Sequence, residues 1–322
     1  MFARHRNQEP DLVQEQESPT ADSEAGDEHM PSFEVEHDSR LSRGISRARA
    51  YAAARSKRHF VGAFAVLLGV VILLLPSPYV IEMPGPTQDV LGKVEDGAVI
   101  DITGTGVTTY KDSGKLLLTT VNASGVPGYP IINAQAVWGW GNPQVEVMPR
   151  EATVPVGQSA DQYQKKVEQD MAGSQDSASA VGLAYAKAHA DELDIDASAL
   201  QHAKVTMHVD SIGGPSAGMM YTLGLIDKLT PANESGGKTI AGTGTIDKDG
   251  KVGRIGGIEL KMLGAKRDGA TWFLAPASNC LDVAGRVPDG LRDVKVATLN
   301  EAYQALVAIG KGQADDLPHC EA

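Results

Sequence analysis

The sequence has few of the residues that build several common kinds of functional site. Only two cysteines occur among 322 residues, and their spacing matches no zinc-binding pattern. Basic residues are outnumbered, with 29 Lys and Arg against 41 Asp and Glu, so the net charge is −12 and the pI about 5.1. A chain this acidic is poorly suited to bind the phosphates of a nucleic acid. We therefore expect no metal, no cofactor and no nucleic-acid partner.

Histidine is scarce where a serine hydrolase would need it. The segment GPSAG, residues 214–218, fits the G-x-S-x-G pattern of the α/β-hydrolase nucleophile turn, with Ser216 at its centre. In that family an acid and then a histidine follow the serine, whereas the only histidine after Ser216 is His319, close to the end of the chain. The sequence therefore argues against a Ser-His-Asp triad. Taken alone, the motif is typical of a turn that caps a helix.

Charge is distributed unevenly along the first part of the chain. Residues 1–38 hold eleven acidic and two basic side chains and few apolar ones, a composition typical of disorder. The next segment reverses the sign, with seven basic residues and no acidic one: Arg40, Arg43, Arg47, Arg49, Arg55, Lys57 and Arg58. We assign residues 1–58 to a disordered cytoplasmic tail that is acidic and then basic.

A long uncharged segment follows the basic cluster. Residues 60–81 form a run of 22 without charge, and a helix of this length spans a hydrocarbon core of about 30 Å. Because positive residues stay cytoplasmic, the basic cluster predicts that the C-terminal part lies outside the membrane. A cleaved signal peptide is the alternative. The late start and the lack of a clear cleavage site favour a retained signal anchor over residues 59–81, with Pro76 and Pro78 at its outer end.

Strand-like and helical segments alternate in the rest of the chain, which we assign to one exported domain over residues 82–322, with its core at about 90–312. Strands are predicted for IDITG, KLLLTTV, AKVTMHVD, TWFLAP and DVKVATL, and for KTIAGTGTI with kinks at its glycines. The segment DKDGKVG, which follows KTIAGTGTI, predicts a hairpin-like turn. Helical spacing marks residues 160–193, the run after Ser216, GIELKMLGAKRDG and NEAYQALVAI. This alternation predicts an α/β or α+β fold.

Three local features carry further expectations. Residues 122–158 are dense in turn residues and predict irregular chain with short strands, in which Trp138 and Trp140 alternate like packed strand residues. Gly173 predicts a break in the helical pattern that begins at residue 160. Cys280 and Cys320 both lie in the exported part, where a disulfide is chemically allowed, and the sequence leaves their pairing open.

A lysine offers another way to activate Ser216. A neutral amine can take the hydroxyl proton, and burial lowers the pKa of lysine by disfavouring the ammonium form. Lys261 has apolar neighbours at i−3, i+1 and i+4 of a predicted helix. Lys266 also has apolar neighbours, so the spacing gives Lys261 only a slight preference, and a lysine that extends to solvent is the plain alternative.

The segments around these residues resemble the proteolytic domain of the Lon proteases. GGPSAGMMYTLGLIDKLT and KTIAGTGTIDKDGKVGRIGGIELKMLGAKRDGATWFLAP carry the likeness, in the order and at the separation that this family has. The resemblance covers residues 170–310 well and 80–160 more loosely. It implies the Lon proteolytic-domain fold, with Ser216 as nucleophile, Lys261 as general base and Thr243 as a hydrogen-bonding residue near the dyad.

Backbone groups at the start of the helix complete the expected site. We expect Gly214 and Ala217 to support the oxyanion of the transition state, while Pro215 has no N–H to offer. The sequence departs from the Lon pattern at Gly213, where an acidic residue is common and Asp210 is the nearest acid. It also departs at Thr245, where Glu is common, and this departure concerns the polar support of the dyad.

The membrane-anchored, exported Lon-like proteases are the most similar group, sharing the anchor and the segments YVIEMPGP, IAGTGTID and LAPASNC. These proteins usually carry a PDZ domain between the helix near Ala184 and the strand near Val205, where this sequence has only about twenty residues. A Walker A loop is not formed by SGGKT, since Ala232 stands where its first glycine belongs. The resemblance therefore implies an ATP-independent endopeptidase that lacks the PDZ domain and cleaves unfolded or flexible polypeptides. It also implies a homo-oligomer, a hexamer in this family.

Two other functions remain open on the sequence. A catalytically silent protein of the same fold would bind peptides or regulate a partner, although the presence of both dyad residues counts against it. An unrelated serine hydrolase or esterase would need the histidine that the sequence does not supply.

Overall fold

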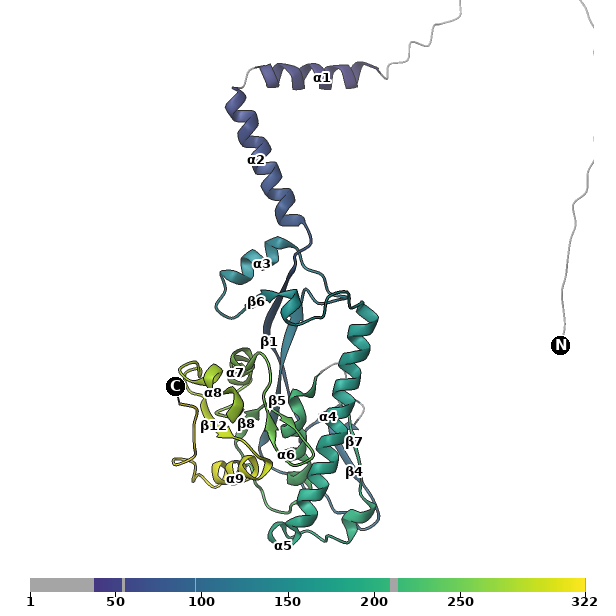
Figure 1. Cartoon of the computed structure of the whole chain (residues 1–322), viewed down its shortest axis with the longest axis vertical. Coiled ribbons are helices and arrows are strands. Elements are labelled where there is room, and N and C mark those ends of the chain that lie inside the picture. Colours follow the sequence, from purple (N-terminus) through teal and green to yellow (C-terminus); the bar gives the residue numbers. More distant parts are fainter. Residues whose placement is uncertain (1–37, 54–55, 96, 209–213, 322) are drawn as a thin grey trace, which may run out of the picture. The chain divides into compact units, whose positions relative to one another are not determined.

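The computed structural model describes four stretches of the chain: residues 38–53, 56–95, 97–208 and 214–321 (Figure 1). The chain divides into two compact units, Met1–Phe64 and Ala65–Ala322, and each is described by itself. Most of the predicted tail lies outside the described residues. The last part of that tail differs from the prediction, because α1 (Asp38–Ala53) is a helix.

Helix α2 (Lys57–Leu74) contains most of the predicted anchor. Among the described residues it is the one helix long and apolar enough to cross a membrane, and none of it is buried by protein. The helix ends at Leu74, before residue 81, where the predicted span ends. Pro76 and Pro78 prevent the helix from continuing, and β1 (Tyr79–Asp89) contains the last residues of the apolar run.

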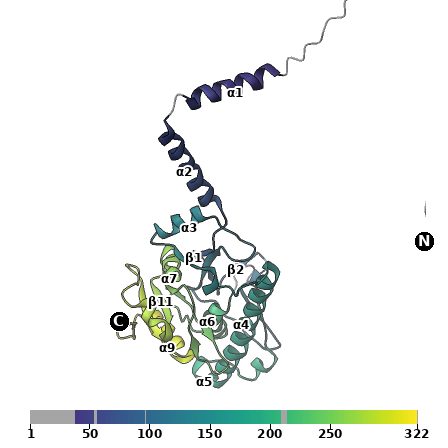
Figure 2. The same cartoon turned by 45° about the horizontal axis from the view of Figure 1, so that its top comes forward.

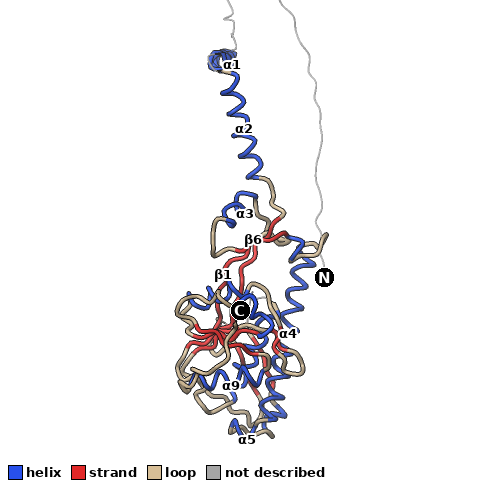
Figure 3. The backbone as a smooth tube through the Cα atoms, turned by 60° about the vertical axis from the view of Figure 1, so that its left-hand side comes forward, coloured by secondary structure: helices blue, strands red, loops and turns tan. Residues whose placement is uncertain are grey.

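A six-stranded mixed sheet forms the centre of the second unit (Figure 3). Its strand order is β12 (Arg292–Val296), β11 (Trp272–Pro276), β8 (Thr239–Gly242), β5 (Lys115–Ser124), β1 and β6 (Glu146–Pro149). The first four strands are parallel, and β1 pairs antiparallel with both β5 and β6. The mixed α/β fold class expected from the sequence is therefore confirmed.

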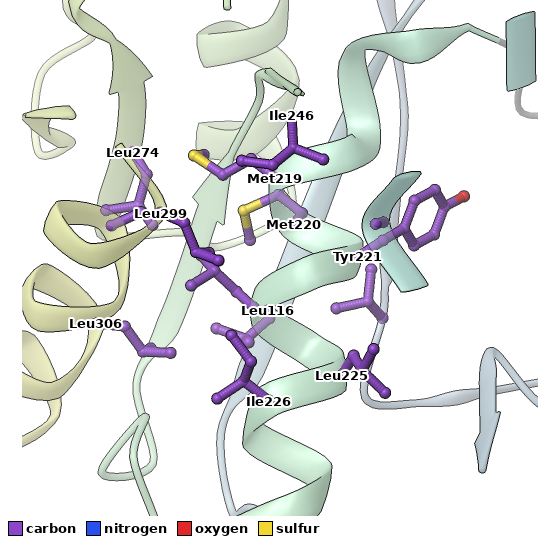
Figure 4. Close-up of a cluster of buried hydrophobic side chains, with 14 of the residues drawn as sticks. Leu116, Met219, Met220, Tyr221, Leu225, Ile226, Ile246, Leu274, Leu299 and Leu306 are labelled. Atoms are coloured by element: carbon purple, nitrogen blue, oxygen red, sulfur yellow. The ribbon is translucent and has the colours of Figure 1, made fainter. Parts of the chain in front are cut away.

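Helices cover both faces of the sheet because the β5 side chains alternate between two apolar clusters. Leu116 and Leu118 pack in the cluster that contains α6 (Gly218–Leu229) and α9 (Leu299–Gly310). Figure 4 shows Leu116 among side chains of both helices. Leu117 packs in the opposite cluster with α7 (Ile258–Arg267) and α8 (Cys280–Val283). Every residue of α6 except Lys228 is buried, which makes this helix the centre of the larger cluster.

Further helices and short strands surround this core (Figure 2). Helix α4 (Ala160–Ala188) packs along α6, and β4 (Ile100–Thr103) pairs with β7 (Lys204–Met207). Strands β9 (Thr245–Ile246) and β10 (Val252–Gly253) form the predicted hairpin. The remaining elements are β2 (Lys93–Val94), β3 (Gly97–Ala98), α5 (Ala190–Leu193), and the 3-10 helices η1 (Arg150–Ala152), η2 (Ala199–His202), η3 (Pro215–Ala217) and η4 (Ala277–Asn279).

The structure corrects three local predictions. Trp138 and Trp140 do not lie on a strand but on α3 (Asn133–Trp140), and both are more than half exposed. Gly173 does not break α4. It lies on an exposed side of the helix, so the missing side chain costs no packing there. The segment KTIAGTGTI is not one strand: it is interrupted after Gly242 and resumes as β9. The pairing that the sequence left open is a disulfide between Cys280 and Cys320.

Candidate active site

Ser216 lies on a tight turn directly before the buried helix α6. It is the central residue of η3 and is partly exposed, while α6 begins two residues later. Gly214 precedes the turn with φ of 116°, a conformation that favours glycine. At Gly218 a Cβ atom would come within 3.1 Å of Ser174 Oγ and of the Ile246 nitrogen, a tight contact that favours glycine there.

The main chain of Ser216 is held by the interruption between β8 and β9. Its carbonyl oxygen accepts a hydrogen bond from the Gly244 N–H at 2.8 Å and another from the Thr243 hydroxyl at 3.0 Å. The Gly244 carbonyl in turn accepts from the Met219 N–H at 3.0 Å. The interruption between β8 and β9 therefore positions groups of the site. In a continuous strand the Gly244 N–H and carbonyl would instead form hydrogen bonds with a neighbouring strand.

Lys261 reaches the same point from α7. Its side chain is 3% exposed, and Nζ donates a hydrogen bond to Thr243 Oγ1 at 3.2 Å. The Thr243 hydroxyl is fully buried and uses both of its roles, accepting from Lys261 and donating to the Ser216 carbonyl. Three residues that the sequence proposed for the site are thus linked by consecutive hydrogen bonds, although they are spread over 46 positions of the chain.

Burial gives Lys261 the electrostatics of a base. Desolvation disfavours its ammonium form and lowers the pKa to about 8, while the negative charge of Glu82 acts in the opposite direction. Lys266, five residues further along α7, is exposed. Apolar spacing in the sequence hardly distinguished the two lysines. The packing of α7 on the sheet distinguishes them, because it buries Lys261 and leaves Lys266 exposed.

Glu82 is a member of this site that the sequence did not reveal. It lies on β1, and its pKa is raised by burial and by the nearby charge of Glu146. A cavity of about 290 Å³ adjoins it, lined by the start of α7 and by several acidic side chains: Glu82, Glu146, Glu259 and Asp282. Nothing in the local sequence marks Glu82, because its proximity to Lys261 arises only when β1 packs against α7.

A second unpredicted feature fixes the loop before α7. The side chain of the fully buried Asn279 accepts from the Ile255 N–H at 3.0 Å and donates to the Ile255 carbonyl at 2.9 Å. Asn279 immediately precedes Cys280, which is joined to Cys320 by the disulfide. This pair of hydrogen bonds ties the loop that leads into α7 to a covalently closed part of the fold.

The other predicted residues have the following places. Gly214 and Ala217 flank the turn that carries Ser216, at its cap and at its last position. Gly213 and Asp210, where the sequence departs from the Lon pattern, lie outside the described residues. Thr245 begins β9 and pairs with Gly253. Within the described part of the chain, no group of three or more His, Cys, Asp or Glu side chains is arranged to hold a metal ion.

Comparison with known proteins places these residues in a family. Residues 140–309 match the family described as the Lon protease (S16) C-terminal proteolytic domain. Lon protease 1 of Sorangium cellulosum is 36% identical over 152 residues, which cover 44% of this chain and 18% of that protein. The Lon protease of Porphyromonas gingivalis is 35% identical over 132 residues, covering 38% and 15% of the two chains.

A third relative extends the similarity. The Lon protease of Trichlorobacter lovleyi is 28% identical over 232 residues, which cover 70% of this chain and 27% of the relative. The chain thus matches under a third of the length of these three curated relatives. The matched family segment contains Ser216, Thr243 and Lys261 and spans more than half of the sequence. On this evidence the chain belongs to the Lon protease (S16) C-terminal proteolytic domain family.

Proposed function

We propose that this protein is a membrane-anchored serine endopeptidase that cleaves unfolded or flexible polypeptides outside the cytoplasmic membrane without ATP. Ser216 is the nucleophile and Lys261 the general base. The observation that carries the proposal is the buried Lys261 amine, hydrogen-bonded through Thr243 to the main chain of Ser216.

The protonation state of Lys261 explains how the site would work. A pKa of about 8 leaves an appreciable fraction of the amine neutral near neutral pH. The neutral amine donates one N–H to Thr243 and keeps a lone pair that accepts the Ser216 hydroxyl proton as Oγ attacks the peptide carbonyl. Lys261 then returns this proton to the leaving amine, and water hydrolyses the resulting ester of Ser216.

The start of the helix supplies donors for the oxyanion. Backbone N–H groups in the first turn of a helix have no partner within it, which at η3 applies to Ser216 and Ala217. The Gly214 N–H adjoins the same turn, while Pro215 has none. Donors fixed in this way contribute about 10²–10³ to the rate of acyl transfer.

Several features support the membrane location and the orientation. Helix α2 has 18 residues and a mean hydropathy of 1.8 over its apolar window, which suits a single span. The basic residues before and at the start of α2 favour a cytoplasmic N-terminus. The Cys280–Cys320 disulfide suits an oxidising compartment, which supports the proposal that the catalytic unit lies on the outer side.

Independence from ATP and the choice of substrate rest on the sequence. Because SGGKT lacks the first glycine of a Walker A loop, the chain has no expected means of unfolding a substrate. Substrates then need to be unfolded or flexible already, so that an extended segment fits beside Ser216.

The proposal is tested by hydrolysis of a fluorescently labelled unfolded protein by the purified full-length chain in detergent micelles. Ser216→Ala and Lys261→Ala are compared with two matched controls, Ser179→Ala on α4 and Lys266→Ala on α7. We expect the first pair to lose activity and the second pair to keep it. Undiminished hydrolysis by Ser216→Ala or Lys261→Ala would contradict the dyad, and an inactive but folded wild type would favour a peptide-binding role instead.

A further inference from the structure

Helix α3 carries three large apolar side chains that are more than half exposed in the described part of the chain. Ala136 and Gly139 are buried against the domain. At 100° per residue Val137 and Trp138 lie on the opposite side of the helix and Trp140 on the flank next to Ala136, and the three are 51%, 53% and 59% exposed. Large apolar side chains exposed together on a short helix usually mark a binding surface.

This helix is attached to the end of the proposed membrane span. The Asn133 side chain donates to the Ile72 carbonyl at 2.9 Å, and the Asn133 N–H donates to the Leu75 carbonyl at 3.0 Å. The Ser77 N–H donates to the Ile131 carbonyl at 2.9 Å. Figure 1 shows α3 beside the C-terminal end of α2 as a result. The start of α3 is therefore tied to the last turn of the apolar helix.

Composition distinguishes this region from the rest of the unit. Residues 122–145 contain no charged side chain, in a sequence that is 22% charged overall. Trp140 packs edge-on against Tyr79, with ring centroids 5.1 Å apart. Tryptophan and tyrosine are enriched where a bilayer meets water, because their rings are apolar and each carries one polar group.

We propose that the outward face of α3 lies in the outer headgroup region of the membrane, with Val137, Trp138 and Trp140 inserted among the lipids. The proposal rests on the proposed membrane span of α2. It gives the protein a second membrane contact, which restrains the tilt of the catalytic unit that a single helix would leave free.

The restraint has a consequence for substrates. β1 begins at Tyr79, beside Trp140, and Glu82 follows three residues later, about 10 Å further along the strand. Glu82 is the residue whose charge acts on Lys261. Docking of α3 therefore holds the catalytic lysine close to the bilayer, which favours polypeptide segments that lie near the membrane surface.

The tryptophans themselves provide the test, because the chain has only three. Trp272→Phe leaves Trp138 and Trp140 as the reporters, and the double variant Trp138→Phe/Trp140→Phe leaves Trp272, which stacks on Arg292 in the sheet. Each full-length variant is reconstituted in phosphatidylcholine vesicles with and without bromine on the lipid acyl chains. We expect brominated lipid to abolish most of the emission of Trp272→Phe and little of that of the double variant.

The outcomes separate the two proposals. Equal quenching of both variants, with the protein retained in vesicles after an alkaline wash, would overturn the docking of α3 while leaving the span intact. Loss of the protein from washed vesicles would contradict the span itself. Emission that changes with protein density and not with bromine would show that a second copy covers α3, and this would also overturn the proposal.

Discussion

Two charged side chains are buried almost equally in this fold, and only one of them lies at a site suited to catalysis. Lys261 is 3% exposed and Asp227, near the end of α6, is 2% exposed. Burial lowers the pKa of Lys261 to about 8 and, with the charges of Asp112 and Glu234, raises that of Asp227 to about 9. Burial therefore shifts both groups toward their neutral forms: near neutral pH Asp227 is mainly neutral, and Lys261 has a minor neutral fraction.

The difference lies in what surrounds each group. Lys261 is joined through Thr243 to the main chain of Ser216, the proposed nucleophile, and Glu82, whose charge acts on Lys261, lines an acidic cavity. The charges that act most on Asp227 are those of the carboxylates Asp112 and Glu234. A shifted pKa thus shows that burial disfavours the charged form of a side chain. The neighbouring groups determine whether that side chain can take part in a reaction.

The strongest test of the comparison is Lys261→Met. We expect the rate of hydrolysis to fall by at least about 10³, because the base is lost. Stability should rise, since below pH 8 the folded protein holds a desolvated ammonium at a cost of about 3 kcal/mol. In the wild type, stability should increase with pH between about 8 and 10.4, where the unfolded chain binds more protons, and the variant should lose this increase.

Chemical denaturation across this pH range measures the stability effect, and Lys266→Met on the exposed side of α7 is the control. If Lys261→Met were as active as the control, Lys261 would not be the base. If the variant were less stable than the wild type at pH 7, burial of the ammonium would not be destabilising.

Thr243→Val should have the next largest effect. The variant keeps the shape of the side chain and removes the hydroxyl that joins Lys261 to Ser216, so we expect a loss of activity of about 10–100-fold. Thr243→Ser should recover most of it. Steady-state hydrolysis of the unfolded substrate is the measurement, and equal activity of the valine and serine variants would show that the hydroxyl has no role.

Asp227→Asn tests the other side of the comparison. Because the folded pKa of Asp227 is raised, the wild type should lose stability as the pH rises from about 4 to 9, where the unfolded chain binds fewer protons. The variant should be at least about 1 kcal/mol more stable at pH 7 and equally active. Denaturant titrations at several pH values report this, and a fall in activity at unchanged folding would assign Asp227 to the catalytic machinery.

Glu82→Gln should have the smallest effect. Removing the negative charge withdraws an interaction that raises the pKa of Lys261, so the rise of activity with pH should shift toward lower pH. A profile shifted in the opposite direction would mean that Glu82 does not act on Lys261 through its charge. Glu259→Gln, at another residue that lines the same cavity, provides the comparison.

Sequence reasoning succeeded where structure is local. The apolar spacing of α7 and α9, the strand β11 and the β9–β10 hairpin all follow from residues close together in the chain. The pairing of Ser216 with Lys261 depended on resemblance, because no periodic pattern connects residues on two helices packed on opposite faces of a sheet.

Other features could not be predicted because distant contacts create them. Periodicity alone could not place Glu82 beside Lys261, nor anticipate the interruption at Gly244, whose N–H bonds Ser216. Trp138 and Trp140 alternate in sequence like strand residues, and a helix of eight residues is too short to show a clear period. The exposure of both tryptophans on α3, which the sequence did not predict, is the basis of the membrane contact proposed for this helix.

The most direct test of the central claim is the pH dependence of kcat/KM of the full-length enzyme with an unfolded polypeptide substrate. The account predicts that the rate rises through an apparent pKa near 8, the value that burial gives Lys261, and then levels off. A rate that rises only near the ordinary lysine value of about 10.4, or that is independent of pH between 6 and 10, would contradict a buried, neutral Lys261 as the base.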